Sequence, residues 1–270
     1  MAATPPENYR LLDVPAVLLR LFHPRPEYGP AGSATTAQEL LIPVAPEVAI
    51  GARFYAAGTS APTLLFFHGN GEIVADYEDL GPIYTARGLN FFPVDYRGYG
   101  RSTGTPTVTA MMQDCHAILA FARDWLEARG VSGPLLVMGR SLGSASALEL
   151  AASHPDRVDG LIIESGFAYA IPLLKLLGVP VWTIDLKEED GFGNLEKIAA
   201  YEGPTLIIHA EHDHIIPFAD GEALWEASSA ADKKLLQIPG ANHNDIFLHG
   251  IREYFDSIKS LAEKVKKGGD

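Results

Sequence analysis

Short apolar runs alternate with longer amphipathic segments along most of the chain. The runs, each short enough for a buried strand, cover residues 63–67, 89–94, 135–138, 160–164, 205–209 and 234–238. The segments between them, which have the apolar spacing of helices, cover residues 76–87, 107–129, 141–153, 218–229 and 245–266. Strands that alternate with helices indicate a mostly parallel sheet with helices on both faces, so the sequence predicts an α/β fold.

The N-terminal part departs from this alternation. Residues 9–22 have helical apolar spacing interrupted by Pro15, which predicts a short helix packed on the body. A membrane-surface contact is a weaker alternative, because the segment is short and has few basic residues. Residues 38–58 alternate in the manner of a β-hairpin, with Pro46 near its turn.

The segment 165–198 is a second departure. It is partly apolar and is interrupted by Pro172, Gly178 and Pro180. A connection of this length inside a compact domain is usually functional. We therefore predict one domain over residues 1–270, with residues 165–198 forming a small cap above the strand ends.

Composition and charge narrow the class of protein. The chain has 270 residues, 47% of them hydrophobic, and a formal net charge of −13. Such acidity argues against a nucleic-acid partner, since phosphates are bound by basic surfaces. The single cysteine, Cys115, permits no internal disulfide, and neither a secretory signal nor an apolar run of membrane-spanning length is evident. We expect a cytoplasmic protein without stable membrane insertion; the sequence does not specify its oligomeric state.

Ser141 is the first candidate for chemistry. It is the centre of Gly139-Arg140-Ser141-Leu142-Gly143, at the change from a strand pattern to a helix pattern. This matches the G-x-S-x-G nucleophile elbow, in which glycines allow strand and helix to approach closely. The motif alone leaves a helix N-cap serine as an equal alternative.

A serine nucleophile needs a base that a third group orients. His243 follows the last predicted strand and is the candidate base, and Asp213 follows the strand before it and is the candidate acid. Glu164, at the end of the strand after Ser141, is a competing acid. Glu211 is nearer its strand end, but its side chain should point away from that of Asp213.

The same region has a metal-site alternative. His212, Asp213 and His214 could be read as ligands, but side chains that alternate along an extended chain point apart. No distant cluster of cysteine, histidine or carboxylate completes such a site. We therefore expect neither a metal nor another cofactor.

Acyl transfer also needs donors for the developing oxyanion. The backbone N–H of Leu142 and that of Asn70, in the glycine-rich loop after residues 63–67, are the candidates. His68 in that loop is predicted to bond loop backbone. Asp95, Arg97 and Arg101 follow the next strand, and we favour bracing of loops over substrate binding for them.

These motifs resemble those of the α/β-hydrolase superfamily. The matching stretches, in order and spacing, are HGNG, DYRGYGRS, GRSLG, EHDHIIP and ANHND. By this resemblance Ser141, Asp213 and His243 correspond to nucleophile, acid and base, and Asn70 and Leu142 to the oxyanion positions. PTLIIHAEHDHIIP and LIIESGF look most like the small-capped group of monoacylglycerol lipases and protein depalmitoylases. Many relatives have SLGG where this chain has SLGS, so Ser144 adds a side chain near the helix start.

The expected function is hydrolysis of a carboxylic ester, a small molecule with a short- to medium-chain acyl group. Apolar residues of the predicted cap should line the acyl pocket, unless they only close the core: Phe167, Tyr169, Ile171, Leu173, Leu174, Leu177 and Trp182. A thioesterase would use the same machinery. An aminopeptidase would need a carboxylate for the substrate amine, and candidates are Asp185, Glu188, Glu189 and Asp190. A non-catalytic receptor on this fold is an alternative of another class.

Overall fold

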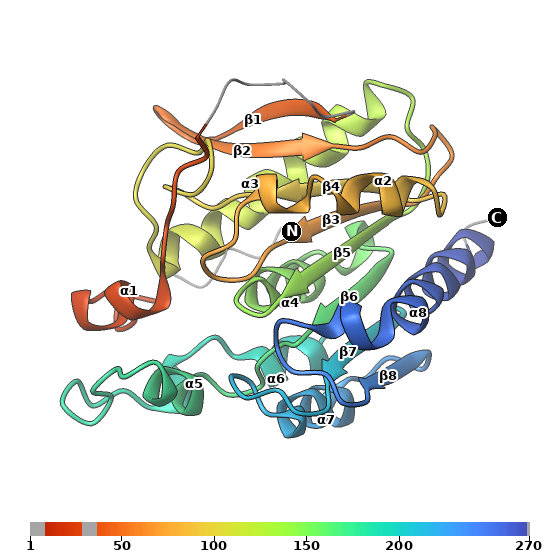
Figure 1. Ribbon diagram of the computed structural model, residues 1–270. Helices are drawn as coiled ribbons and strands as arrows, with labels where there is room; N and C mark the ends of the chain where they lie inside the picture. Colours follow the sequence, from red (N-terminus) through yellow and green to blue (C-terminus); the bar gives the residue numbers. More distant parts are fainter. Residues whose placement is uncertain (1–8, 29–36, 269–270) are drawn as a thin grey trace.

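The centre of the computed structural model, which describes residues 9–28 and 37–268, is an eight-stranded sheet (Figure 1). The strands, in spatial order, are β1 (Gln38–Ala45), β2 (Val48–Phe54), β4 (Asn90–Val94), β3 (Thr63–Phe67), β5 (Leu135–Arg140), β6 (Gly160–Glu164), β7 (Thr205–Ala210) and β8 (Lys233–Ile238). The strands β1 and β2 form the predicted hairpin, and β2 pairs antiparallel with β4. The other pairings are parallel, which confirms the predicted α/β class.

Helices cover both faces of this sheet. They are α1 (Pro15–Leu21), α2 (Leu80–Thr85), α3 (Val108–Glu127), α4 (Gly143–Ser153), α5 (Ala170–Leu176), α6 (Asn194–Ala199), α7 (Phe218–Ala227) and α8 (Ile246–Gly268), with short 3₁₀ turns η1 (Val74–Tyr77), η2 (Pro155–Arg157) and η3 (Glu188–Asp190). Leu65 and Phe67 of β3 face the core under α3 and α4, whereas Leu64 and Phe66 face the core under α2 and α8. Because both faces of β3 are buried, its sequence is apolar throughout after Thr63.

Two predicted helices have different bounds in the structure. The segment 76–87 is divided at residues 78–79 into η1 and α2, and Pro82 lies in the first turn of α2, where its missing N–H costs no helical hydrogen bond. Pro15 does not interrupt a helix but begins α1, in the first turn, where a missing N–H has no cost. The residues before it form a turn, and Asp13 accepts hydrogen bonds from the first amides of α3.

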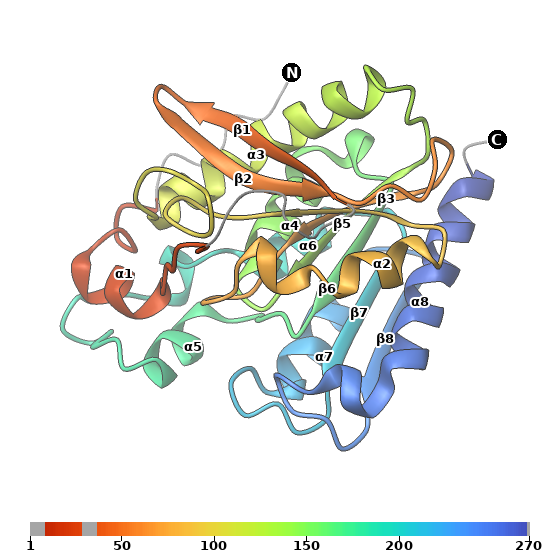
Figure 2. The same cartoon turned by 45° about the horizontal axis from the view of Figure 1, so that its top comes forward.

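The connection from β6 to β7 contains α5, η3 and α6 and holds the predicted cap segment. Its helix α5 lies beside α1 at one end of the molecule (Figure 2). Within the described residues, no helix is long and apolar enough to cross a membrane. Residues 1–8, which belong to the N-terminal stretch without an evident secretory signal, lie outside the described residues.

Parallel pairing brings the carboxyl ends of the central strands to one edge. Phe67 at the end of β3 is level with Gly139 of β5, and Gly139 is level with Ile163 of β6. The loops after β3, β5, β6, β7 and β8 therefore leave the sheet on the same side (Figure 1). This is where a sheet of this type places its functional residues.

Candidate active site

Ser141 occupies a sharp turn between β5 and α4. Its backbone lies in the left-handed region, with φ 51°, a conformation that costs a non-glycine residue roughly 1–3 kcal/mol. A Cβ on Gly139 would lie 2.2 Å from the carbonyl oxygen of Gly143, and one on Gly143 would lie 2.2 Å from that of Phe67. The Ser141 amide donates to the carbonyl of Glu164 at 2.8 Å. Both glycines of the motif are thus required by close backbone approach.

Ser141, His243 and Asp213 form a continuous hydrogen-bonded row. Nδ1 of His243 is 2.7 Å from Oδ2 of Asp213, and Nε2 of His243 is 3.0 Å from Oγ of Ser141. Ser141 follows β5, His243 follows β8 and Asp213 follows β7, and each of the three residues is buried. With the ring proton on Nδ1, the Nε2 atom is free to accept the hydrogen bond of the serine hydroxyl.

The loop after β7 holds Asp213 as an anion. Its Oδ1 accepts the backbone N–H groups of Ile215 and Ile216 at 2.9 and 2.8 Å. Burial alone would raise the pKa of Asp213, but hydrogen bonds from His243 and these amides lower it below its usual value. His209, whose pKa is lowered by burial, donates from Nε2 to the Ile216 carbonyl at 2.8 Å and braces the same loop.

Asn70 lies in the loop after β3, and its side chain is already occupied. Its Oδ1 accepts from the backbone N–H of His23 at 2.9 Å and from the Tyr99 hydroxyl at 2.8 Å. Among the described residues, no acceptor is bound to the backbone N–H of Asn70 or to that of Leu142. Both amides are therefore available to a ligand.

Ser144, whose role the sequence left open, is completely buried near the start of α4. Its Oγ donates to the carbonyl oxygen of Ser141 at 2.6 Å. The Ser144 amide donates to the same carbonyl at 3.0 Å. The hydroxyl that replaces the usual glycine therefore adds a second hydrogen bond to the strained turn.

The competing carboxylates face other partners. Glu164 accepts from Arg140 Nε at 3.1 Å and from the Tyr254 hydroxyl at 2.7 Å, and burial raises its pKa. Glu211 accepts from the Gly240 amide at 2.8 Å. Of the three acids considered, Asp213 is the one in hydrogen-bond contact with the ring of the histidine at position 243.

The side chains of His212, Asp213 and His214 alternate in burial, as expected for an extended segment. Asp213 is buried, whereas both flanking histidines are exposed. In residues 9–28 and 37–268, no group of three histidine, cysteine or carboxylate side chains is arranged to hold a metal ion.

The charged residues near these loops make structural contacts. His68 is completely buried, with Nδ1 2.8 Å from the Gly69 carbonyl and Nε2 3.2 Å from Asp95. Arg97 makes two hydrogen bonds of 2.7 Å to Asp114 on α3. Arg101 forms an ion pair of 3.1 Å with Glu27. Like the contacts of His68 and Arg97, this pair holds one segment of the chain against another.

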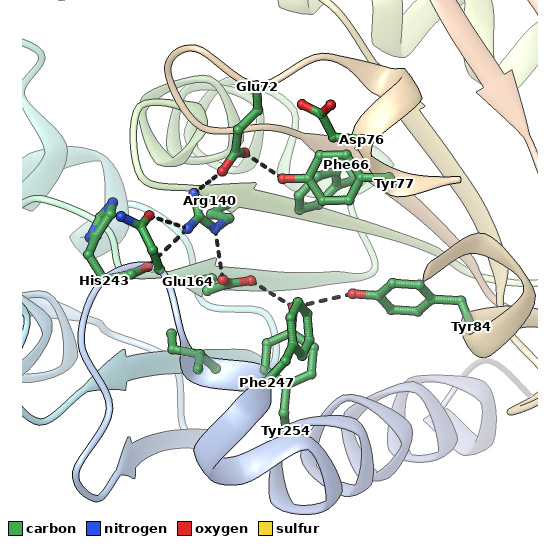
Figure 3. Close-up of a pocket in the computed structure, with 12 residues that line it drawn as sticks. Phe66, Glu72, Asp76, Tyr77, Tyr84, Arg140, Glu164, His243, Phe247 and Tyr254 are labelled. Atoms are coloured by element: carbon green, nitrogen blue, oxygen red, sulfur yellow. Dashed lines mark hydrogen bonds and ion pairs between the residues drawn. The ribbon is translucent and has the colours of Figure 1, made fainter. Parts of the chain in front are cut away.

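Arg140, beside Ser141, is a residue whose contacts the sequence did not predict. It lies between Glu72 and Glu164 and also donates to the carbonyl of His243 (Figure 3). Next to it is a cavity of about 180 Å³, lined by the residues Phe66, Glu72, Asp76, Tyr77, Tyr84, Arg140, Glu164, His243, Asn244, Ile246, Phe247 and Tyr254. The available signal was an arginine inside the elbow motif, together with a glutamate at or after the end of each of the two strands that flank β5, namely β3 and β6.

The apolar residues of the segment 165–198 divide into three groups by their exposure. Phe167 and Leu174 are completely buried in the main core, where Phe167 packs edge-on against Phe192 with ring centres 5.2 Å apart. Tyr169 is 39% exposed and Trp182 is 76% exposed. Ile171, Leu173 and Leu177 are half-buried against the same core. Phe167 and Leu174 therefore belong to the hydrophobic core and do not line a pocket in this structure.

Comparisons with known proteins agree with this architecture. A family model described as serine aminopeptidase, S33, matches residues 58–183. Human alpha/beta hydrolase domain-containing protein 17B is 32% identical over 213 residues, which are 75% of this chain and 66% of that protein. Protein bem46 of Schizosaccharomyces pombe is 28% identical over 201 residues, 70% of this chain and 64% of that protein. The chain spans just under two thirds of the length of these curated relatives.

Solved structures share the fold at low sequence identity. An esterase from Pyrococcus furiosus has a TM-score of 0.72 at 17% identity and covers 90% of this chain and 98% of its own. A monoglyceride lipase from Saccharomyces cerevisiae, in complex with a substrate analogue, has a TM-score of 0.66 at 18% identity, with 88% and 98% covered. Sheet, elbow and these matches together define the class: the chain belongs to the α/β-hydrolase superfamily.

Proposed function

We propose that this chain is a serine hydrolase that cleaves carboxylic esters with short- to medium-chain acyl groups through an acyl-enzyme. The observation that carries the proposal is the row from Ser141 through His243 to Asp213, with distances of 3.0 and 2.7 Å. A hydroxyl, a base and a buried anion in this order are what nucleophilic acyl transfer requires.

In the first half of the reaction the Ser141 oxygen attacks the acyl carbon while His243 Nε2 takes its proton. Asp213 keeps the ring oriented and stabilises the imidazolium. The oxyanion receives the N–H groups of Asn70 and Leu142, which have no acceptor among the described residues. The tetrahedral intermediate collapses, and His243 gives its proton to the departing alcohol. The acyl group is then an ester of Ser141.

In the second half, water takes the place of the alcohol. His243 removes a proton from the water, which attacks the acyl carbon and forms a second oxyanion at the same two amides. Collapse of this intermediate releases the carboxylic acid and returns the proton to the serine oxygen. The balance of the cycle is one ester and one water to one acid and one alcohol, without a cofactor.

We propose that residues 165–198 act as a cap that contacts the acyl group. Phe167 and Leu174 lie in the core. The main apolar side chains of this segment that remain for contact with substrate are Tyr169, Leu173 and Trp182. Such a small apolar surface favours short and medium acyl chains over long ones. The cytoplasmic location and the one-domain organisation stay predictions.

Amide hydrolysis is a second candidate, because the matching family model is described as a serine aminopeptidase. The carboxylates that could bind a substrate amine are partly engaged in local structure. Glu188 accepts the amides of Ala170 and Ile171 at 2.5 and 2.9 Å, and Asp190 accepts the Lys187 amide at 2.9 Å. These contacts favour the ester, while a thioester would differ only in its leaving group.

Labelling with a fluorophosphonate tests the assignment. The reagent should modify the wild-type protein and leave Ser141→Ala unmodified; equal labelling of the two, or none of the wild type, would refute a serine nucleophile. Nitrophenyl esters of increasing chain length should then be compared with matched thioesters and aminoacyl anilides. Anilide turnover well above ester turnover would assign the protein as an aminopeptidase, and a preference for long chains would refute the acyl-size proposal.

A further inference from the structure

Arg140 makes four contacts with three separate parts of the chain. Its Nε donates to Glu164 at 3.1 Å, its Nη1 donates to Glu72, and its Nη2 donates to the carbonyl of His243 at 2.9 Å and to Asn244 Oδ1 at 3.2 Å. The side chain is 12% exposed. Figure 3 shows the guanidinium between the two glutamates, beside the loop of the histidine.

Each of these three parts supports a different component of the proposed active site. Glu72 accepts the amide of Gly69 at 2.7 Å, and Gly69 is the residue before the oxyanion candidate Asn70. The backbone carbonyl of Glu164 accepts the amide of Ser141. The third part is the main chain of His243 itself. One side chain therefore connects the supports of nucleophile, base and oxyanion donor.

We propose that Arg140 is a positioning residue, whose guanidinium holds the loops of His243 and Asn70 in register with Ser141. This inference rests on the proposed serine hydrolase function. Arg140 does not touch the hydroxyl or the imidazole ring in the contacts above. It acts through the backbone of one loop and the carboxylate that anchors the other.

The shape of the side chain makes arginine specific for this role. A guanidinium presents five N–H donors in a rigid planar fork, so it can bond in several directions at once. A lysine ammonium keeps the charge but is a compact donor on a flexible stem. It could reach one carboxylate, but it could not hold Glu72, Glu164 and the His243 carbonyl together. Charge and geometry can therefore be separated by substitution.

The test compares Arg140→Gln and Arg140→Lys with a matched control, Arg53→Gln. Arg53 is also a buried arginine between two glutamates, Glu27 at 2.8 Å and Glu39 at 3.3 Å, but it lies on β2. Esterase kcat and KM should be measured on protein whose competent fraction is counted by fluorophosphonate. We expect Arg140→Gln to lower kcat on the order of 10²-fold with KM changed less than about threefold.

The other variants give distinct expected results. Arg140→Lys should recover only part of kcat, since it restores charge but not geometry. Arg53→Gln should lose stability while its kcat per competent molecule stays near that of the wild type. Should Arg140→Gln fail to fold, Arg140→Lys and Glu72→Gln carry the test, each with a kcat loss at nearly constant KM. An unchanged kcat in the folded Arg140 variants, or full recovery with lysine, would overturn the proposal.

A second measurement does not depend on turnover. The hydrogen-bonded proton between His243 and Asp213 should give a downfield proton NMR resonance in the wild type and in Arg53→Gln. Loss or marked shift of that resonance in Arg140→Gln supports positioning, and an unchanged resonance contradicts it. If the wild-type protein has no hydrolase activity, the proposed function fails, yet this resonance still reports whether Arg140 orders the histidine loop.

Discussion

Glu149 gives a quantitative test of how α4, the helix that follows Ser141, is held against its neighbours. This residue of α4 is 1% exposed. Its carboxylate lies 2.8 Å from Lys197 Nζ of α6, 3.3 Å from His116 Nε2 of α3, and accepts the Ser153 hydroxyl at 2.9 Å. Burial opposes the charge, but these contacts outweigh it and lower the pKa of Glu149 from its ordinary 4.5 to about 2. The fall corresponds to a stabilisation of about 3 kcal/mol by the ionised form.

The sign of this effect follows from linkage. A carboxyl with a lower pKa in the folded state contributes its stabilisation above the unfolded pKa, and loses it as the pH falls toward the folded pKa. We therefore expect Glu149→Gln to lower the free energy of unfolding by about 3 kcal/mol at pH 6. The difference from wild type should hold down to about pH 5 and fall to less than half by pH 3.

Urea denaturation of wild type and Glu149→Gln at several pH values measures this difference directly, because comparison at one pH removes the titration of most other carboxyls. Glu189→Gln is the matched control, since Glu189 is 77% exposed and lies 3.9 Å from Lys187. It should change stability by less than about 1 kcal/mol. A Glu149→Gln effect that stays constant from pH 6 to pH 3, or never exceeds that of the control, would refute the reasoning.

Four further substitutions test the elbow and the choice of acid. Asp213→Asn should lower ester kcat by about 10³-fold or more, because the histidine loses its anionic partner. Glu164→Gln should lower ester kcat less than tenfold, because the glutamine still accepts hydrogen bonds. The opposite order of the two effects would assign Glu164 as the acid. Gly143→Ala places a Cβ 2.2 Å from the Phe67 carbonyl and should cost about 2 kcal/mol or more in urea unfolding, so wild-type stability would contradict the close approach. Ser144→Ala removes the 2.6 Å hydrogen bond to the turn and should cost about 1 kcal/mol in the same assay. Unfolding at wild-type stability would contradict this expectation.

Local chemistry made much of the site visible in the sequence. The G-x-S-x-G motif marked Ser141 because a strained turn between a strand and a helix needs glycine on both sides, and that requirement is met within five residues. The positions of Asp213 and His243 followed from counting strands, since residues after parallel strands meet at one edge. The division of the segment 76–87 was not predicted, although Pro82 in the first turn of α2 is compatible with a helix that begins just before it.

Partners that are distant along the chain could not be assigned in this way. Whether Asp213 or Glu164 meets the histidine depends on side-chain directions at two strand ends, and both are acids in similar positions. The four contacts of Arg140 join residues up to 104 positions apart, so no local pattern could reveal them.

The sequence by itself determined the α/β architecture, the elbow and the order of serine, acid and histidine, because these depend on the period of apolar residues and on local backbone sterics. Only the tertiary structure decided which carboxylate contacts His243, that Phe167 and Leu174 are withdrawn into the core, and that Arg140 connects three loops. Those outcomes depend on packing and on the desolvation of charges, which arise when distant segments are brought together.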